Sequence, residues 1–242
     1  MRYHVLATDY DGTLAHNSRV NDTTVQSLQS FLATGRRLVM VTGRELPELL
    51  EVFPRTELFE WVVAENGGLL YRPSTKEERP LAEAPSEKLV EALRKKGVDR
   101  ISVGRVIVAT WEPFETVVLE SIRELGLELQ VIFNKGAVMV LPSGVNKATG
   151  LAAALAELGL SPHNAVGVGD AENDHAFLAC CERGVAVANA LPALKEMADL
   201  VTVADHGAGV VELIDQLLAD DLAGIGPGEH RSKKIAGDIP RA

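Results

Sequence analysis

The sequence contains almost no cysteine. Its 242 residues include only Cys180 and Cys181, which are neighbours. Adjacent cysteines seldom form a structural disulfide, and this pair lacks the spacing of a metal site. The six histidines show no ligand spacing either. We therefore expect the two cysteines to be small core residues on a helix, in a protein of the reducing cytoplasm.

Long apolar runs and basic residues are also scarce. No apolar run is long enough to span a bilayer, and the N-terminus lacks the pattern of a signal peptide. The chain has 24 Lys and Arg against 34 Asp and Glu, a formal net charge of -10. Such a surface would repel nucleic acid and anionic membranes, so we expect neither as a partner. A phosphorylated substrate stays possible, because a divalent cation and a few local basic residues can reverse the sign inside one pocket.

Hydrophobic residues make up 46% of the chain, which is enough for a sizeable core. Their pattern alternates between strands and helices in two blocks that flank the middle of the chain. This alternation is typical of a doubly wound α/β fold, a parallel sheet with helices on both faces. The predicted strands of these blocks are residues 3–8, 37–41, 61–64, 165–168, 185–188 and 200–203. The first predicted helix is capped by Asn21 or Asp22 and ends at Gly35. The other predicted helices are residues 46–53, 147–158, 173–181, 191–198 and 209–218.

The composition changes between the two blocks. Residues 73–80 are polar and rich in turn formers, which indicates an exit from the first block. After this exit we expect helices at 86–96 and 113–125 and strands at 101–110, 128–134 and 137–141, with a hairpin loop at Asn134-Lys135-Gly136. We predict a core of residues 1–74 and 143–225, an inserted small α+β cap at 75–142, and a linker or disordered tail at 226–242.

Residues with useful chemistry follow several of the predicted strands, at the point where each strand ends. Asp9 and Asp11 come after the first strand, and Gly12 then lets the backbone turn away. Three other segments begin in the same way: Thr42-Gly43-Arg44, Asn146-Lys147 and the run from Asp170 to Asp174. The carboxyl ends of strands in an open α/β sheet are where such folds bind ligands. Taken alone, two acids before Gly and Thr would also suit a surface turn.

In this order the segments resemble the four signature motifs of the haloacid dehalogenase (HAD) superfamily of phosphohydrolases. The run Asp9-Tyr10-Asp11-Gly12-Thr13 matches the whole first motif, Asp-x-Asp-Gly-Thr. Thr42 matches the second motif, Lys147 the third, and the set Gly169, Asp170, Asn173 and Asp174 the fourth. The phrase Glu65-Asn66-Gly67-Gly68 resembles a turn of the Cof-like branch with a C2-type cap, subfamily IIB. The resemblance extends over roughly residues 3 to 220.

The resemblance implies a Mg²⁺-dependent phosphatase that forms an aspartyl-phosphate and acts on a small phosphorylated metabolite, such as a sugar phosphate or phosphoglycolate. Asp9 would be the nucleophile, and Asp11 would act as the acid and then the base. Thr42 and Lys147 would bind the phosphoryl oxygens, while Gly43, Arg44 and Asn66 complete the predicted substrate-binding set. The metal would be held by Asp9, by Asp170 and by the main-chain oxygen of Asp11. Asn173 and Asp174 would support the site directly or through water.

Several of these residues also have a purely structural interpretation. Asp170 or Asn173 could cap a helix by holding backbone N–H groups, and Thr13 could orient Asp11 or stabilise its turn. Lys147 could be an exposed lysine in a first helical turn, although a cation there opposes the helix dipole. Arg44 could instead form a surface ion pair, and for Asn66 we favour a turn with positive φ. A structural role is also favoured for four residues of the insert that are candidates to face the substrate: Arg105, Trp111, Asn134 and Lys135.

Two other functions stay open at this point. The first is phosphoryl transfer to an acceptor other than water, as in a phosphomutase, because Asp11 favours rapid hydrolysis without excluding transfer. The second is a non-catalytic regulatory module attached through the tail to a longer chain. The complete set of acids together with Lys147 argues against this module. The sequence identifies neither the metabolite nor the oligomeric state.

Overall fold

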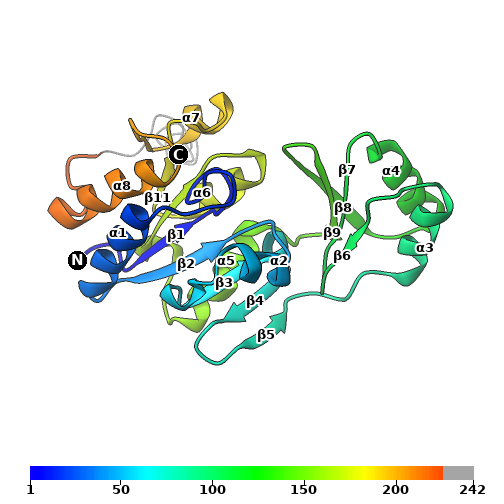
Figure 1. Ribbon diagram of the computed structural model, residues 1–242, viewed down its shortest axis with the longest axis horizontal. Helices are drawn as coiled ribbons and strands as arrows, with labels where there is room; N and C mark the ends of the chain where they lie inside the picture. Colours follow the sequence, from blue (N-terminus) through cyan, green and yellow to red (C-terminus); the bar gives the residue numbers. More distant parts are fainter. Residues whose placement is uncertain (226–242) are drawn as a thin grey trace, which may run out of the picture.

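The computed structural model describes residues 1–225, and these form a larger and a smaller β-sheet (Figure 1). The larger sheet has the strand order β12-β11-β10-β1-β2-β3-β4-β5. Its strands are β1 (Val5–Thr8), β2 (Arg37–Val41), β3 (Trp61–Ala64), β4 (Leu69–Arg72), β5 (Glu77–Pro80), β10 (Ala165–Gly169), β11 (Arg183–Ala186) and β12 (Leu200–Val201). The strands from β12 to β3 are parallel, and β4 and β5 add an antiparallel edge. The predicted doubly wound α/β core is therefore confirmed.

Strand β1 occupies the centre of this sheet, at the point where the chain order reverses. It pairs with β10 on one side and with β2 on the other, and Thr8 is level with Val168 and Met40 in the two ladders. The residues that follow these three strands therefore emerge side by side at one edge. A crevice outside the carboxyl ends of the strands is expected at such a switch point.

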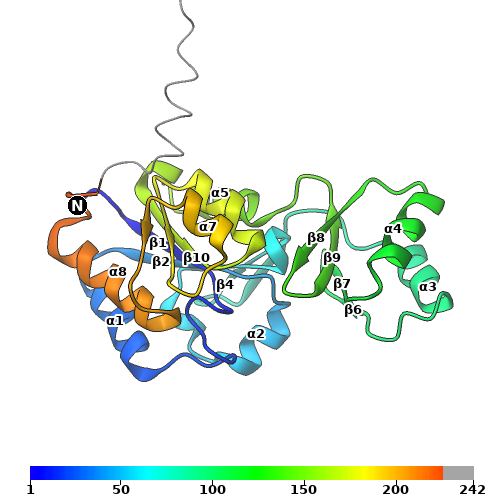
Figure 2. The ribbon, with the colours of Figure 1, turned by 90° about the horizontal axis from the view of Figure 1, so that it is seen from above.

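Helices cover both faces of the larger sheet. α1 and α8 contact each other on one face, and α5 and α6 contact each other on the opposite face (Figure 2). The core between these layers is apolar, and Cys181 is buried in it. Among the helices of residues 1–225, none has both the length and the hydrophobicity to cross a membrane. The helices are α1 (Asp22–Ala33, capped by Asn21), α2 (Leu46–Val52), α5 (Lys147–Glu157), α6 (His175–Cys180), α7 (Pro192–Met197) and α8 (His206–Asp220).

The smaller sheet belongs to the inserted cap. Its order is β6-β7-β9-β8, and α3 and α4 cover the face that lies away from the core (Figure 1). Side chains alternate along β9, so that Val138 and Val140 pack against the cap helices while Met139 and Leu141 belong to a separate cluster. The elements are α3 (Glu87–Lys95), β6 (Ser102–Val103), β7 (Val108–Trp111), α4 (Glu115–Glu124), β8 (Leu129–Asn134) and β9 (Ala137–Pro142).

Two stretches differ from the sequence prediction. The single strand predicted at 101–110 is wrong, because a tight turn splits it into β6 and β7. The polar exit predicted at 73–80 instead contains β5, which pairs with β4 at the edge of the larger sheet. An edge strand can be polar because it is not sandwiched between two apolar layers. The chain therefore leaves the larger sheet after Pro80. The domain division at 75–142 stays a prediction, and the tail at 226–242 lies outside the described residues.

A buried carboxylate connects the core to the cap. Glu65 belongs to a short 3-10 turn, η2 (Glu65–Gly67), and its side chain is directed at the turn between β6 and β7. One oxygen accepts a hydrogen bond from the backbone N–H of Arg105 at 2.9 Å, and the other accepts from Val106 at 2.7 Å and Ile107 at 3.1 Å. Glu65 is only 1% exposed. A buried charge is tolerated where several N–H groups replace its water shell.

We expect Glu65→Ala to lower the free energy of unfolding by about 1–3 kcal/mol, because three backbone N–H groups of the cap turn would lose their acceptor in a buried place. Urea unfolding measures the total loss, and amide hydrogen exchange at Arg105, Val106 and Ile107 shows whether the turn has loosened. Glu91→Ala on the exposed face of α3 is the matched control. Equal stability and equal exchange in the two variants would contradict this account of Glu65.

Candidate active site

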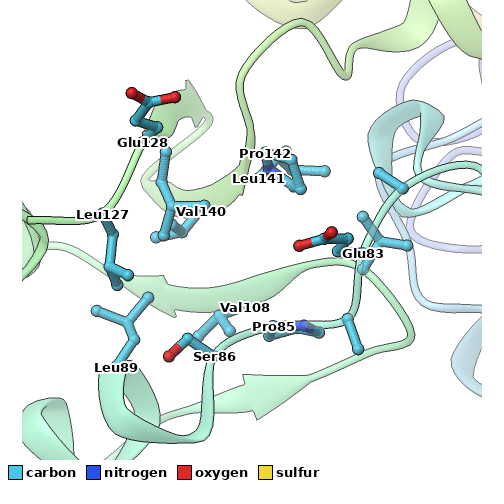
Figure 3. Close-up of a pocket in the computed structure, with 14 residues that line it drawn as sticks. Glu83, Pro85, Ser86, Leu89, Val108, Leu127, Glu128, Val140, Leu141 and Pro142 are labelled. Atoms are coloured by element: carbon cyan, nitrogen blue, oxygen red, sulfur yellow. The ribbon is translucent and has the colours of Figure 1, made fainter.

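The structure has two cavities to consider. One, of about 480 Å³, lies inside the cap and its connection to the core, and Leu89, Leu127 and Val140 are among its walls (Figure 3). Its charged residues are two glutamates, Glu83 and Glu128, so it presents no positive group for a phosphate. The other cavity, of about 300 Å³, lies where the cap meets the carboxyl ends of the core strands. Five of the predicted site residues line this second cavity: Asp9, Asp11, Gly43, Arg44 and Asn173.

Three acids converge at the edge of the larger sheet. Asp9 follows β1, Asp170 follows β10, and Asp174 ends a 3-10 turn, η4 (Glu172–Asp174). One carboxylate oxygen from each of them lies within 4.8 Å of the others, and all three residues are buried. The Asp9 amide donates to the Val168 carbonyl at 3.0 Å, which extends the β1–β10 pairing to the site. Acids that are far apart in the sequence therefore meet because their strands are neighbours.

Lys147 lies among these acids. It is the first residue of α5, whose start is capped by the Asn146 side chain. Its ammonium is 2.5 Å from Asp9 Oδ1 and 2.6 Å from Asp174 Oδ1, and the residue is 1% exposed. Burial alone would lower the pKa of Lys147, but the two carboxylates raise it above its ordinary value. The interpretation of Lys147 as an exposed first-turn lysine is therefore wrong.

The fourth motif is organised by Asp174. Its Oδ2 accepts hydrogen bonds from the backbone N–H groups of Asp170 at 2.8 Å and Ala171 at 2.9 Å. Asp174 thus performs the capping that the sequence attributed to the cluster, and it leaves the Asp170 carboxylate for other partners. Thr13 donates to Asp170 Oδ1 at 3.0 Å, so it orients Asp170 and not Asp11. Gly12 has φ +89°, and a Cβ there would lie 2.3 Å from Asp170 Oδ2, which explains the glycine.

Asp11 is held by Arg44. The guanidinium donates to both carboxylate oxygens, from Nε at 2.6 Å and from Nη2 at 2.7 Å, and also to Glu48 at 2.8 Å. Arg44 therefore forms an ion pair, and its partner is Asp11, the residue predicted to act as acid and base. Arg44 lines the cavity, but its donors are engaged by protein groups. The Thr42 hydroxyl accepts from the Arg44 amide at 3.1 Å, which places this threonine beside the same pair.

The two asparagines of the site contact each other. Asn173 Nδ2 donates to Asn66 Oδ1 at 2.9 Å, and both residues are buried. Asn66 has φ 53°, so it takes the positive φ of a turn and also reaches the site. Within residues 1–225, Asn173 Oδ1 has no hydrogen-bond partner although it is buried beside the cavity. Gly43 also lines the cavity, and the cap residue Met139 lies close to it.

The cap contributes a cation. Lys135, at the turn between β8 and β9, donates to Asp170 Oδ2 at 2.7 Å and to the main-chain oxygen of Asp11 at 3.1 Å. Trp111 and Asn134 line the same cavity, so three of the four cap candidates are at the site. Arg105 is not, because its side chain pairs with Glu78 at 3.0 Å. Sequence reasoning missed Met139, which the alternation along β9 directs toward the core.

The oxygen donors here fit a divalent cation. Burial, together with the neighbouring acids, raises the pKa of Asp9, and burial also raises the pKa of Asp170. Positive charge at this point would oppose both shifts. Asp9, Asp170 and the main-chain oxygen of Asp11 supply the hard oxygen ligands that Mg²⁺ prefers. Asp174 accepts hydrogen bonds from Lys147 and from two backbone N–H groups, and one of its oxygens also lies within 4.8 Å of the Asp9 and Asp170 oxygens.

Known proteins with similar sequences match this chain over most of their own length. The chain is 32% identical over 221 residues to phosphoglycolate phosphatase 2 of Saccharolobus solfataricus, which covers 89% of this chain and 92% of that protein. It is 35% identical over 219 residues to a phosphoglycolate phosphatase of Haloarcula marismortui, with 86% of this chain and 95% of the relative covered.

Solved structures show the same fold. A haloacid dehalogenase-like hydrolase from Bacteroides thetaiotaomicron superposes with a TM-score of 0.74 at 20% identity and covers 89% of this chain and 99% of its own. The sucrose-phosphatase of Synechocystis, solved with sucrose and phosphate, gives a TM-score of 0.66 at 22% identity, with 89% and 98% covered. The sequence pattern of the haloacid dehalogenase-like hydrolase family matches residues 6–110 and 118–214. The chain therefore belongs to the haloacid dehalogenase-like hydrolases.

Proposed function

We propose that this chain is a Mg²⁺-dependent phosphatase that hydrolyses a small phosphorylated metabolite through an aspartyl-phosphate on Asp9. Family membership and relatives named phosphoglycolate phosphatase make it a phosphatase. The observation that carries the finer proposal is the convergence of the Asp9, Asp170 and Asp174 carboxylates, which have oxygens within 4.8 Å of one another, with the Lys147 ammonium on Asp9. The main-chain oxygen of Asp11 is close to this cluster, because the Lys135 ammonium contacts both that oxygen and Asp170. Phosphoglycolate is our first candidate substrate, because the relatives are named for it.

The carboxylates at the strand ends would repel a phosphate, so a positive charge must bind beside them before a phosphate can enter. Asp9, Asp170 and the main-chain oxygen of Asp11 would hold Mg²⁺, and the bound cation would supply charge neutralisation between the carboxylate nucleophile and the phosphoryl oxygens. Lys147 adds a second, fixed positive charge, because its ammonium already contacts Asp9. The Thr42 hydroxyl and Lys147 would bind phosphoryl oxygens as negative charge builds on them.

In the first half-reaction an Asp9 carboxylate oxygen bonds to phosphorus while the bond from phosphorus to the ester oxygen breaks. Lys147 holds one Asp9 oxygen, which leaves the other for attack. The departing oxygen takes a proton from Asp11, so the leaving group departs as an alcohol. Arg44 fixes the Asp11 carboxyl by two hydrogen bonds and therefore acts as a positioning residue.

In the second half-reaction Asp11 takes a proton from water. The water oxygen bonds to phosphorus as the bond to Asp9 breaks, which releases inorganic phosphate and restores both aspartates. Asp11 has access to water for this step, because its side chain is 37% exposed and lines the cavity. Asp9 is buried and shielded, which suits a residue that must not lose its phosphoryl group to bulk water unassisted.

Asp9→Asn should reduce turnover of phosphoglycolate by at least about a thousandfold, because an amide is a poor nucleophile while the shape of the site is kept. Phosphate release in the presence of Mg²⁺ measures the loss, and far-UV circular dichroism verifies the fold. Asp215→Asn, on the exposed face of α8, is the matched control and should keep its activity. Normal turnover by Asp9→Asn would remove Asp9 from the chemistry.

Asp11→Asn should let a phospho-enzyme accumulate when the substrate is an aryl phosphate. An aryl oxide leaves without a proton, whereas the second half-reaction still needs the missing base. Rapid quenching followed by peptide mass spectrometry should find one phosphoryl group on Asp9. Wild-type protein under the same quench is the control and should carry much less of it. A phosphoryl group on any residue other than Asp9 would refute the proposed intermediate.

Chelation of divalent ions should abolish activity, and Mg²⁺ should restore it. Binding to the native state also stabilises it, so Mg²⁺ should raise the melting temperature of wild-type protein. Asp170→Asn should lose most of this increase because it removes one charged ligand, whereas Asp215→Asn should keep it. Scanning calorimetry with and without Mg²⁺ makes the comparison. A full Mg²⁺-dependent increase in Asp170→Asn would show that the metal binds elsewhere.

A further inference from the structure

Lys135 extends from the cap into the carboxylate cluster of the core. It lies in the turn between β8 and β9, and the next residue, Gly136, accepts a hydrogen bond from the Glu112 amide at 2.9 Å. This bond ties the backbone of the turn to the end of β7. The side chain of Lys135 is 46% exposed and its ammonium contacts Asp170 and the main-chain oxygen of Asp11. The turn is therefore anchored while the charged end of Lys135 is accessible.

The two oxygens that Lys135 contacts are also two of the oxygens proposed to hold the metal. Its ammonium is 2.7 Å from Asp170 Oδ2 and 3.1 Å from the Asp11 oxygen, so a divalent cation bound to both would displace it. The lysine side chain is long and flexible, which lets the ammonium move while the turn stays in place. After displacement it would still lie in the cavity between cap and core.

Few other positive groups are available there. Arg44 is the second basic residue among those that line the cavity, and it is held by Asp11 and Glu48. Lys147 is buried and bridges Asp9 and Asp174. Within residues 1–225, Lys135 is thus the cation of this site that would lose both of its partners, Asp170 and the main-chain oxygen of Asp11, to the metal.

Lys135 also lies close to the residue that is proposed to protonate the leaving group. It contacts the main chain of Asp11, and the side chain of Asp11 is the proposed proton donor to the leaving oxygen. Lys135 and Asp11 line the same cavity, so the displaced ammonium would share that cavity with the leaving group. Glu48 lines this cavity together with the uncharged Trp111 and Met139. A second negative group on the substrate would be repelled by Glu48 unless a cation paired with it.

We propose that Lys135 is the residue that selects phosphomonoesters whose leaving group carries a carboxylate a few bonds from the ester oxygen. The inference rests on the phosphatase function proposed above. With a divalent cation held by Asp170 and the main-chain oxygen of Asp11, the Lys135 ammonium would be free of these partners and would pair with the substrate carboxylate. The substrate class is that of short phosphorylated hydroxy acids, and esters with a neutral leaving group would not gain this ion pair.

The test compares two esters of similar size. Phosphoglycolate carries the carboxylate, and 2-hydroxyethyl phosphate replaces it with a neutral hydroxymethyl group. Lys135→Met should lower kcat/KM for phosphoglycolate by about 10- to 100-fold, mainly through KM, and affect the neutral ester much less. Lys135→Arg should recover most of the loss because it restores the charge. Lys95→Met, on an exposed position of α3, should behave as wild type.

A binding measurement gives a readout that is independent of turnover. Calorimetric titration with Mg²⁺ alone should show tighter binding to Lys135→Met than to wild type, because the competing ammonium is gone. Equal losses on both esters, no loss on either, or unchanged Mg²⁺ affinity would overturn the role of Lys135. If wild-type protein hydrolyses neither ester with Mg²⁺, the phosphatase proposal itself fails, and this outcome is distinct from the others.

Discussion

The site depends on one buried interaction, the ammonium of Lys147 between the carboxylates of Asp9 and Asp174. Three acids within 4.8 Å of one another repel strongly when they are removed from water, so they need an internal cation to stay folded together. A lysine at the first position of a helix opposes the helix dipole and has little reason to be buried there otherwise. The carboxylates and the lysine therefore require each other. Their pairing fixes the start of α5 against the ends of β1 and β10.

The turn η2 transmits this constraint to the rest of the molecule. Its three residues have three different partners: Glu65 binds the cap turn, Asn66 binds Asn173 of the fourth motif, and Gly67 packs on the backbone of Asn146. A Cβ on Gly67 would lie 2.0 Å from the Asn146 oxygen, and φ there is +104°, so only glycine fits. Because Asn146 caps α5, a single turn links the cap, the acidic loop and the helix that carries Lys147. A displacement of the cap would therefore also shift the carboxylates of the fourth motif and the start of α5.

The residues at strand ends were predictable because parallel strands bring their carboxyl ends to one edge whatever the loops between them do. Asp9 and Asp170 meet for this reason, because β1 and β10 are neighbours in the larger sheet. Lys147 is different, because it reaches Asp9 from the start of α5, which follows the cap strand β9. The cap anchor Glu65 was not predictable, since its partners lie about forty residues further on and are backbone N–H groups, which leave no side-chain pattern. The edge strand β5 was missed because both of its faces tolerate polar residues, so the apolar alternation that reveals strands is absent. The hydrogen bond from Thr13 to Asp170 could not be predicted from the sequence either, because it depends on how closely Gly12 approaches Asp170 in the fold.

The basic residues of the site differ in how firmly they are held, and under the proposals above this difference would separate the groups used for chemistry from the group that selects the substrate. Lys147 is held between the buried carboxylates of Asp9 and Asp174, and Arg44 is held between Asp11 and Glu48, whose side chains are 37% and 59% exposed. Neither cation can follow a ligand without leaving one of its carboxylates unpaired. Lys135 comes from the cap and contacts the Asp170 carboxylate and the main-chain oxygen of Asp11, and its side chain is 46% exposed. Both contacts are with hard oxygens of the kind that Mg²⁺ prefers. A cation that can be exchanged for another is the one able to respond to what enters the cavity. Under the two proposals, the core would fix the groups that break the phosphate ester, and the cap would hold the charge that distinguishes one ester from another.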